Sequence, residues 1–288
     1  LPWAKPLLIS STLTQATIYV LRPMITYRAL ELDANAAQIG LIASVYALFP
    51  VVLALQFGKW VGRMGEAKFI IYGTLAMLVT SAALMFANSI TLLALAAGAA
   101  GLAHLACMVG GQSMVALRAP SESYDRYFGF YTFSASVGHM LGPIVAAIVA
   151  GSNGNLPKST SNAFLLGVVL TILALFPVIR WRNERPTVVA QQSSEGTFKT
   201  AINLVKRPGI LAAIYISLAI SSAADVLVVF LPLFGTENNF SPYAVGAILA
   251  IRAGTTMLSR FFLGRLSDRF TTFQLLWWST VISVISCA

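Results

Sequence analysis

Long apolar runs separated by short polar segments form the dominant pattern of this chain. An α-helix needs about 20 apolar residues to cross a hydrocarbon core about 30 Å thick, and the runs are of that order. They are about twice as long as barrel strands and do not alternate apolar with polar residues, so they predict helices. We expect eight complete transmembrane helices and the start of a ninth, at approximately 7–30, 37–57, 69–88, 90–118, 127–151, 163–181, 210–234, 244–263 and from 273 onward.

The composition indicates the same class of protein. A soluble domain has roughly 25% charged residues, whereas this chain has 10%, and 57% of its residues are hydrophobic. Pattern and composition together predict an all-α integral membrane protein. The net charge of +9 does not predict a nucleic-acid partner, because the basic residues lie between apolar runs and not on the face of a soluble domain. Both cysteines, Cys107 and Cys287, lie inside apolar runs, where we expect packing and neither a disulfide nor a metal site.

Lysine and arginine residues gather in alternate loops, and this asymmetry predicts the orientation of the chain. Because positive residues beside transmembrane segments favour the cytoplasmic side, we expect the N-terminus and the basic loops in the cytoplasm of a multi-pass inner (plasma) membrane protein. The chain begins at Leu1 and ends within an apolar run at Ala288, so we expect it to be part of a longer protein. The basic loops contain Lys5, Lys59, Arg63, Lys68, Arg118, Arg126, Arg180, Arg182, Arg185, Lys199, Lys206, Arg207, Arg265 and Arg269, and the opposite loops have little besides Arg28 and Lys158.

An internal repeat divides the chain into two units. Constant offsets between similar features are typical of duplication. They predict an N-terminal six-helix bundle over 1–181, a cytoplasmic linker over 182–209 and a partial C-terminal bundle over 210–288, cut off in its third helix. The linker is either a short amphipathic helix on the inner membrane surface or a disordered segment. The repeated pairs are Gly40 with Gly246, Gly58 with Gly264 and Arg63 with Arg269, at one offset, and Pro23 with Pro232 at a similar one.

Two basic, glycine-containing loops carry a resemblance to a known family. The first contains Gly58, Arg63, Gly65 and Lys68, and the second contains Gly264, Asp268 and Arg269. Together they resemble the G-x-x-x-D-[RK]-x-G loop of the major facilitator superfamily, although Gly62 replaces the aspartate in the first loop and Thr271 replaces the later glycine in the second.

The resemblance implies two six-helix bundles related by a pseudo-two-fold axis along the membrane normal, around a central cavity. In the family, the acidic residue of this loop acts as a latch that stabilises the outward-facing state. Because Gly62 carries no acid, the resemblance assigns that role to Asp268. An acid at a helix N-terminus would be stabilised by the helix dipole. The alternative is that the charges of both loops serve only to orient the chain.

The fifth run contains Gly138, Gly142 and Pro143. They resemble the G-x-x-x-G-P-x-x-G-G signature of drug:proton antiporters in the same superfamily, with Ala146 and Ala147 in place of the last two glycines. Small residues one turn apart also occur wherever two membrane helices pack closely, so both interpretations remain open.

Charged residues inside the apolar runs are the candidates for energy coupling. Asp225 lies deep in the seventh run, Arg22 in the first and Arg252 in the eighth, at similar depths. An ionised side chain at the bilayer centre costs at least ~2.5 kcal/mol, so such residues normally face a cavity or a partner. We expect Asp225 to pair with Arg22 or Arg252. Our hypothesis is that Asp225 couples transport to protons, and the alternative is a static pair that holds the two halves together.

Several further polar residues are candidates for the cavity wall. His104 and His139 can titrate near neutral pH, although a single histidine in a span is more often a packing residue. Arg22 precedes Pro23, which frees a backbone carbonyl, and a guanidinium is suited to binding carboxylate or phosphate. The remaining candidates are Tyr19, Tyr46, Gln112 and Tyr131.

These features predict a secondary active transporter that moves a small molecule by alternating access. Drug efflux in exchange for protons is the leading prediction, and proton-coupled uptake of a small organic anion or a sugar is the second. A non-transporting receptor or a channel is the alternative from another class. The sequence has no P-loop, H-E-x-x-H or C-x-x-C motif, so we expect no enzyme, no cofactor and no metal, but a monomer in the lipid bilayer that uses the proton gradient.

Overall fold

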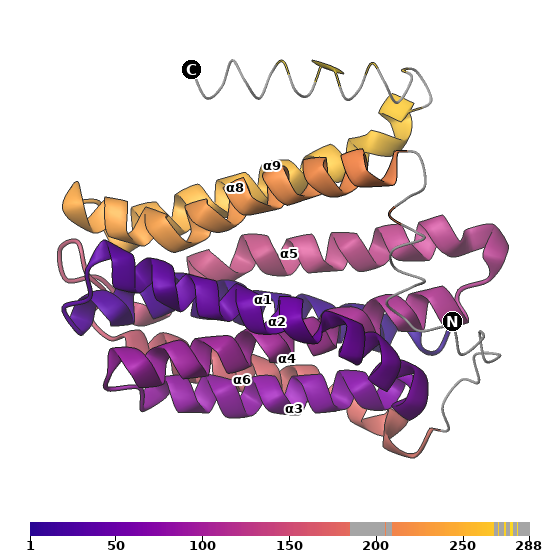
Figure 1. Ribbon diagram of the computed structural model, residues 1–288, viewed down its shortest axis with the longest axis horizontal. Coiled ribbons are helices and arrows are strands. Elements are labelled where there is room, and N and C mark those ends of the chain that lie inside the picture. The colour runs from indigo at the N-terminus through magenta and orange to yellow at the C-terminus, as the bar shows by residue number, and fades with distance from the viewer. Residues whose placement is uncertain are drawn as a thin grey trace.

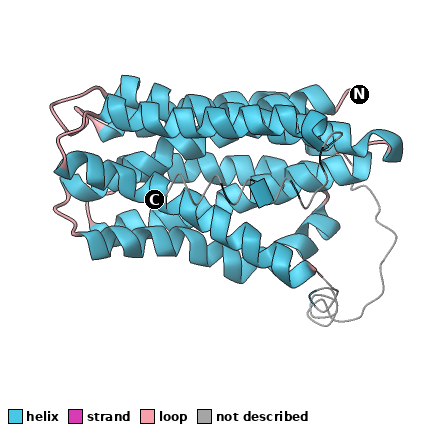
Figure 2. Ribbon diagram, turned by 90° about the horizontal axis from the view of Figure 1, so that it is seen from above, coloured by secondary structure: helices cyan, strands magenta, loops and turns pink. Residues whose placement is uncertain are grey.

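The computed structural model describes residues 1–184 and 209–267, and the single residues 205, 270, 274, 277, 278 and 281. In these ranges the chain forms long α-helices, two 3₁₀ helices and no strand beyond one isolated bridge (Figures 1 and 2). The helices are α1 (Ala4–Glu31), α2 (Ala36–Met64), α3 (Glu66–Met85), α4 (Ile90–Arg118), η1 (Ser121–Ser123), α5 (Tyr124–Ala150), α6 (Thr160–Val178), η2 (Ile179–Asn183), α8 (Ile210–Glu237) and α9 (Pro242–Ser267).

Each of the eight predicted complete spans corresponds to one helix. Five of the described helices, α2 to α6, are long and apolar enough to cross a membrane by length and composition. α1 is as long as these but carries Ser10, Thr14, Gln15 and Arg22, the first three of which are buried in the bundle. The predicted all-α membrane fold is confirmed. Most of the predicted linker (185–204 and 206–208), most of the predicted ninth helix, and Asp268 and Arg269 lie outside the described residues.

α2 is longer than its apolar run predicts. The helix continues past residue 57 through Gly58 and Gly62 to Met64, and only Gly65, with a φ of 86°, turns the chain into α3. The interpretation of this segment as a glycine-rich loop is therefore wrong for all but Gly65. The reason is that a glycine makes helix formation only about 1 kcal/mol less favourable than an alanine does, while lysine and arginine favour helices.

The helices lie side by side along the long axis of the molecule (Figure 1). α1 packs on α5 and α6, and α4 packs between α2 and α3. α8 lies against α1, and α9 lies against α5, so these two helices cover one side of the six-helix bundle. We call the end at which α1 begins the basic end, because Arg63 and Arg118 lie there, and the end at which α1 stops the opposite end.

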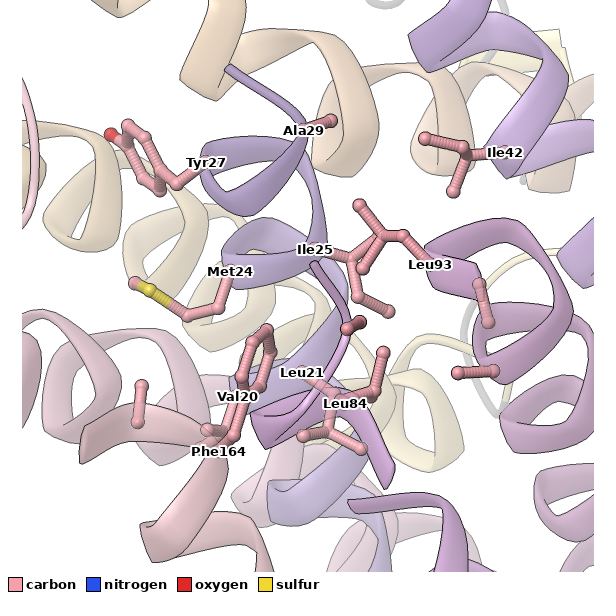
Figure 3. Packing of buried hydrophobic residues seen from close by; sticks show 14 of the residues in the cluster. Val20, Leu21, Met24, Ile25, Tyr27, Ala29, Ile42, Leu84, Leu93 and Phe164 are labelled. Carbon is pink, nitrogen blue, oxygen red and sulfur yellow. The ribbon is translucent and has the colours of Figure 1, made fainter. Parts of the chain in front are cut away.

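The largest apolar cluster lies near the opposite end. Val20, Leu21 and Met24 of α1 are buried against Phe164 of α6 and Leu84 of α3 (Figure 3). The burial of these α1 side chains against other helices places α1 at the centre of the N-terminal bundle. Large apolar side chains also cover the exterior, as lipid-facing helices require, including Val51, Val79, Ile148 and Phe176.

Candidate functional site

An ion pair joins the two halves of the chain. The Nη1 atom of Arg22 on α1 lies 2.6 Å from Oδ1 of Asp225 on α8. The Arg22 side chain is only 9% exposed, whereas that of Asp225 is 55% exposed. Of the two predicted partners for Asp225, the structure selects Arg22. In the described part of the chain Arg252 has no ion pair, and its Nε atom is buried without a hydrogen-bond acceptor.

A mostly apolar cavity lies beside this pair, and its empty space of about 350 Å³ includes the mouth that opens to solvent. Arg22 is the charged residue of its wall, and Thr26 and Tyr46 add hydroxyl groups. The guanidinium of Arg22 lies over the ring of Tyr46, 4.9 Å from its centroid, in a cation–π arrangement. The cavity therefore has one cationic side chain in a mostly apolar wall. Its lining residues are Arg22, Ile25, Thr26, Ala29, Ile39, Ile42, Ala43, Tyr46, Ala97 and Val229.

A chain of polar contacts continues from Tyr46 toward the basic end. The Tyr46 hydroxyl lies 2.9 Å from Nδ1 of His104, and Nε2 of His104 lies 3.1 Å from Oε1 of Gln15. The same Gln15 oxygen lies 3.0 Å from Nε2 of His139, whose ring stacks on Tyr19 with centroids 4.0 Å apart. The structure thus brings Tyr19, Tyr46 and both histidines together.

Gln15 connects these residues, and the sequence interpretation did not identify it. It is buried in α1, and a single glutamine in an apolar run gives no periodic signal. The available signal was its spacing, because Gln15, Tyr19 and Arg22 recur at three- to four-residue intervals and so share one helix face.

Two other predicted wall residues lie elsewhere. Gln112 is exposed on α4 and lines neither of the two cavities described, so its place in a cavity wall stays a prediction. The residue next to it, Gly111, faces Tyr131, and a helix rotates the following side chain by about 100°. Tyr131 is buried, and with Gln15, Cys107 and several hydroxyl side chains it lines a second, smaller cavity toward the basic end.

The basic end contains a buried acidic residue that the resemblance to the loop motif did not predict. Glu66, the first residue of α3, is 1% exposed and lies 2.8 Å from Arg118 at the end of α4. Arg118 also lies 2.6 Å from Glu184, which follows η2. Gly62 contributes no acid, but Glu66 supplies one four residues later. Arg118 binds both Glu66 and Glu184 and so connects the ends of three helices. Arg63 is exposed, and Lys68 is partly exposed.

The glycines of the fifth-span signature mediate close helix packing. A Cβ atom on Gly142 would lie 2.8 Å from the carbonyl oxygen of Ala16 on α1, and Gly138 faces the Thr12 carbonyl still more closely. On the other side of α5, Gly246 of α9 faces the carbonyl of Pro143. The geometry therefore gives these small residues a structural role at the contacts of α5 with α1 and α9.

The two halves touch toward the opposite end. The Thr26 hydroxyl donates to the Val229 carbonyl at 2.9 Å, and the Asn155 amide donates to the Thr236 carbonyl at 2.8 Å. Toward the basic end, by contrast, the first half of α8 exposes Leu211, Ile214, Tyr215 and Leu218.

Comparisons with curated proteins find proteins named for drug resistance. Quinolone resistance protein NorA of Staphylococcus aureus is 20% identical over 267 residues, which are 91% of this chain and 66% of that protein. Multidrug resistance protein MdtG of Dickeya zeae is 23% identical over 258 residues, which are 85% of this chain and 60% of that protein. Multidrug resistance protein 1 of Bacillus subtilis is 23% identical over 146 residues, 50% of this chain and 38% of that protein. The chain therefore spans 38% to 66% of the length of these relatives.

Solved structures share the fold. A bacterial homologue of the human lysosomal transporter Spinster, in an inward-facing and unoccupied conformation, superposes with a TM-score of 0.71 at 17% identity. The match covers 93% of this chain and 62% of that one. The family model of the Major Facilitator Superfamily matches residues 7–288. On this match, and on the shared helical fold, the chain belongs to the major facilitator superfamily.

Proposed function

We propose that the protein is a proton-coupled secondary transporter that exports small amphipathic molecules across the inner membrane. The observation that carries this proposal is the Arg22–Asp225 pair, which links the two halves beside an apolar cavity. The relatives named for multidrug and quinolone resistance support efflux as the direction of transport. The apolar wall of the cavity suits the hydrophobic part of such molecules.

The exposed side of Asp225 provides a route for the proton. With 55% of its side chain exposed, the carboxylate is accessible to water while it binds Arg22. Protonation of Asp225 removes the attraction between α1 and α8, and deprotonation restores it. A proton on this carboxylate would therefore change how strongly the two halves hold together, which is the requirement for coupling to alternating access.

The contacts between the halves support an inward-facing state. They lie toward the opposite end, at Thr26, Asn155 and Asp225, while the beginning of α8 is exposed toward the basic end. With the N-terminus in the cytoplasm, as the positive-inside rule predicts, the closed end faces outward. We propose that a single copy of the chain carries out this cycle.

The test is transport by the full-length protein in proteoliposomes with an imposed pH gradient. We expect Asp225→Asn to abolish proton-driven accumulation of a fluorescent amphipathic substrate, with at least tenfold loss of rate. Substrate exchange without a pH gradient should persist, because that process moves no net protons. Glu122→Gln, which neutralises an exposed acid outside the cavity, is the matched control. Full proton-driven transport by Asp225→Asn would contradict the proposal.

A second candidate function is proton-coupled uptake of a small organic anion. Arg22 supports it, because this guanidinium is the charged group of the cavity and could bind a carboxylate in place of Asp225. Proton exchange on binding separates the two functions. An anion that displaces Asp225 from Arg22 would bind together with a proton, whereas an exported substrate in antiport would release one. A pH-independent ion conductance would instead indicate a channel.

A further inference from the structure

Arg252 on α9 carries a charge that no described residue balances. It forms no ion pair in the part of the chain that the structure describes, and its Nε atom is buried without an acceptor. It lines neither of the two cavities described. Because a guanidinium stays charged and an ionised group at membrane depth normally has a partner, Arg252 needs a carboxylate that this state does not provide.

The sequence contains one carboxylate at a suitable depth. Of its ten acidic residues, Asp225 lies inside an apolar run, and the other nine lie near helix ends or in predicted loops. Arg22 contacts one oxygen of this carboxylate, Oδ1, and the Asp225 side chain is 55% exposed. A carboxylate has about four acceptor sites. A second guanidinium can therefore approach Asp225.

Arg252 and Asp225 lie at similar depths in the helical hairpin of α8 and α9. Gly235 on α8 packs against Val245 on α9, since a Cβ atom on the glycine would lie 2.7 Å from Cγ2 of the valine. From this contact toward the basic end, Asp225 is ten residues away along α8 and Arg252 is seven residues away along α9. At 1.5 Å per residue, the two depths differ by about 5 Å, which is less than one helical turn.

Arg252 continues the face of α9 that packs on α8. Val245, Leu249 and Arg252 recur at intervals of four and three residues, and so share one face of the helix. Val245 and Leu249 are buried in one cluster with Val228 and Leu231 of α8. The guanidinium therefore belongs to the side of α9 that is directed toward α8.

Asp225 lies between the two contact faces of α8. Each residue turns the helix by about 100°, so Val228 lies about 60° to one side of Asp225 and Val229 about 40° to the other. Val228 belongs to the cluster with α9, and the Val229 carbonyl accepts the hydrogen bond from Thr26 of α1. A small rotation of α8 therefore moves the carboxylate from one neighbouring helix toward the other.

We propose that Arg252 is the alternative partner of Asp225. In this structure the carboxylate binds Arg22 and so joins the two halves. In the other state of the cycle it binds Arg252, within the second half. The exchange releases α8 from α1 without lowering the number of ion pairs, and Arg22 keeps its place over the ring of Tyr46. This inference rests on the proposed function, because it assigns the second pair to the second state of alternating access.

The experiment measures how often the opposite end is closed. Spin labels are attached at Asn153→Cys and Glu237→Cys, which are exposed residues of the two halves, in full-length protein without other cysteines. Pulsed electron paramagnetic resonance in lipid nanodiscs gives the distance between the labels and hence the ratio of closed to open molecules. Neither a substrate nor a pH gradient is present.

The two arginines should change this ratio in opposite directions. Arg22→Gln should lower the ratio of closed to open molecules about fivefold, and Arg252→Gln should raise it about fivefold, the size expected for a partly exposed ion pair. Arg252→Gln is also measured together with Arg22→Gln, so that an end already closed does not hide its effect. Arg252→Lys keeps the charge and should change the ratio by less than about twofold.

The effect of Arg252 should depend on the Asp225 carboxylate. In an Asp225→Asn background, Arg252→Gln should leave the ratio unchanged, because the shared partner is absent. An equal effect with and without the carboxylate would overturn the inference in favour of another partner. So would a ratio that Arg252→Gln leaves unchanged in both proteins that retain Asp225.

A reversed pair covers the case in which Arg252→Gln does not fold. Asp225→Arg with Arg252→Asp restores an ion pair between α8 and α9 but places an arginine opposite Arg22, so it should favour the open end. A closed end in this variant would contradict the inference. Failure of the proposed function is a separate result, because it is measured as proton-driven transport by Asp225→Asn.

Discussion

At the scale of single residues, two arginines inside the bundle form ion pairs with acids on other helices. Arg22 finds Asp225 on α8, and Arg118 finds Glu66 on α3. Removing one partner of a buried ion pair leaves an uncompensated charge, which is more destabilising than the absence of both. Asp225 is exposed, whereas Glu66 is buried. We therefore expect the loss of the Arg22–Asp225 pair to affect coupling and the loss of the Arg118–Glu66 pair to affect stability.

A measurement of stability tests the ion pair between Arg118 and Glu66. Arg118→Met removes the arginine that pairs with the carboxylate of Glu66, which is 1% exposed. We expect a loss of about 3 kcal/mol in the free energy of unfolding, seen as a lower thermal midpoint of the purified protein. The double variant Glu66→Gln, Arg118→Met should recover part of that loss, because no buried charge remains.

Arg126→Met provides the matched control at the same end of the bundle. Arg126 is exposed, and its guanidinium lies over the ring of Phe130. Its replacement should change stability by less than about 1 kcal/mol. Equal midpoints for the Arg118 and Arg126 variants would show that the Glu66 pair contributes nothing to the fold.

The spacing of residues explains which of these contacts could be predicted. Equal depth in related spans indicated that Asp225 pairs with an arginine, because a charge in the bilayer needs a partner at its own level. Depth could not distinguish Arg22 from Arg252, since that choice depends on the rotation of each helix. Gln15 and Glu66 went unpredicted because their importance arises from residues distant in the sequence.

At the scale of helices, close contacts at glycines restrict the packing of α5. This helix contacts α1 on one side and α9 on the other through glycines with no space for a side chain. The fifth-span motif is therefore explained by packing in this structure. A role in antiport, which the resemblance implies, stays a prediction.

A pair of glycine substitutions tests this restriction. Gly142→Ala places a methyl group 2.8 Å from the Ala16 carbonyl oxygen, and we expect a loss of 1–3 kcal/mol from the forced separation of α1 and α5. Gly129→Ala, in the same helix with open space around it, should gain up to about 1 kcal/mol from helix propensity. Thermal midpoints measure both. A stabilising Gly142→Ala would refute the close contact.

At the scale of the whole molecule, the hydrogen bonds between the two halves that the described residues form lie toward the opposite end. The contact between Asn155 and Thr236 lies at the edge of that closed end, in the loop after α5 and the last turn of α8. Transport by alternating access requires such contacts to break in each cycle. They offer a direct way to stop the cycle.

A reversible cross-link tests that requirement. In the variant with Asn155→Cys and Thr236→Cys, oxidation should join the halves at the closed end and reduce transport at least tenfold. A reducing agent should restore the rate. The two single variants control for the substitutions themselves. Undiminished transport by the oxidised, cross-linked protein would exclude opening at this end as part of the cycle.

The sequence by itself determined the class, the helix count of the described part and the division into basic and opposite loops. These properties are one-dimensional, because each membrane helix satisfies its own backbone and must contain enough apolar residues to span the bilayer. The break between α2 and α3 at Gly65 is also a local property, because glycine readily adopts the positive φ of 86° found there.

Only the tertiary structure decided which side chains meet. The Gln15 contact with two histidines, the choice of Arg22 for Asp225, and the burial of Glu66 depend on how helices rotate and cross. Hydrophobicity does not specify those angles in a membrane, because lipid and protein interiors are similarly apolar. Close packing at small residues and hydrogen bonds between helices specify them, and both are properties of pairs of helices.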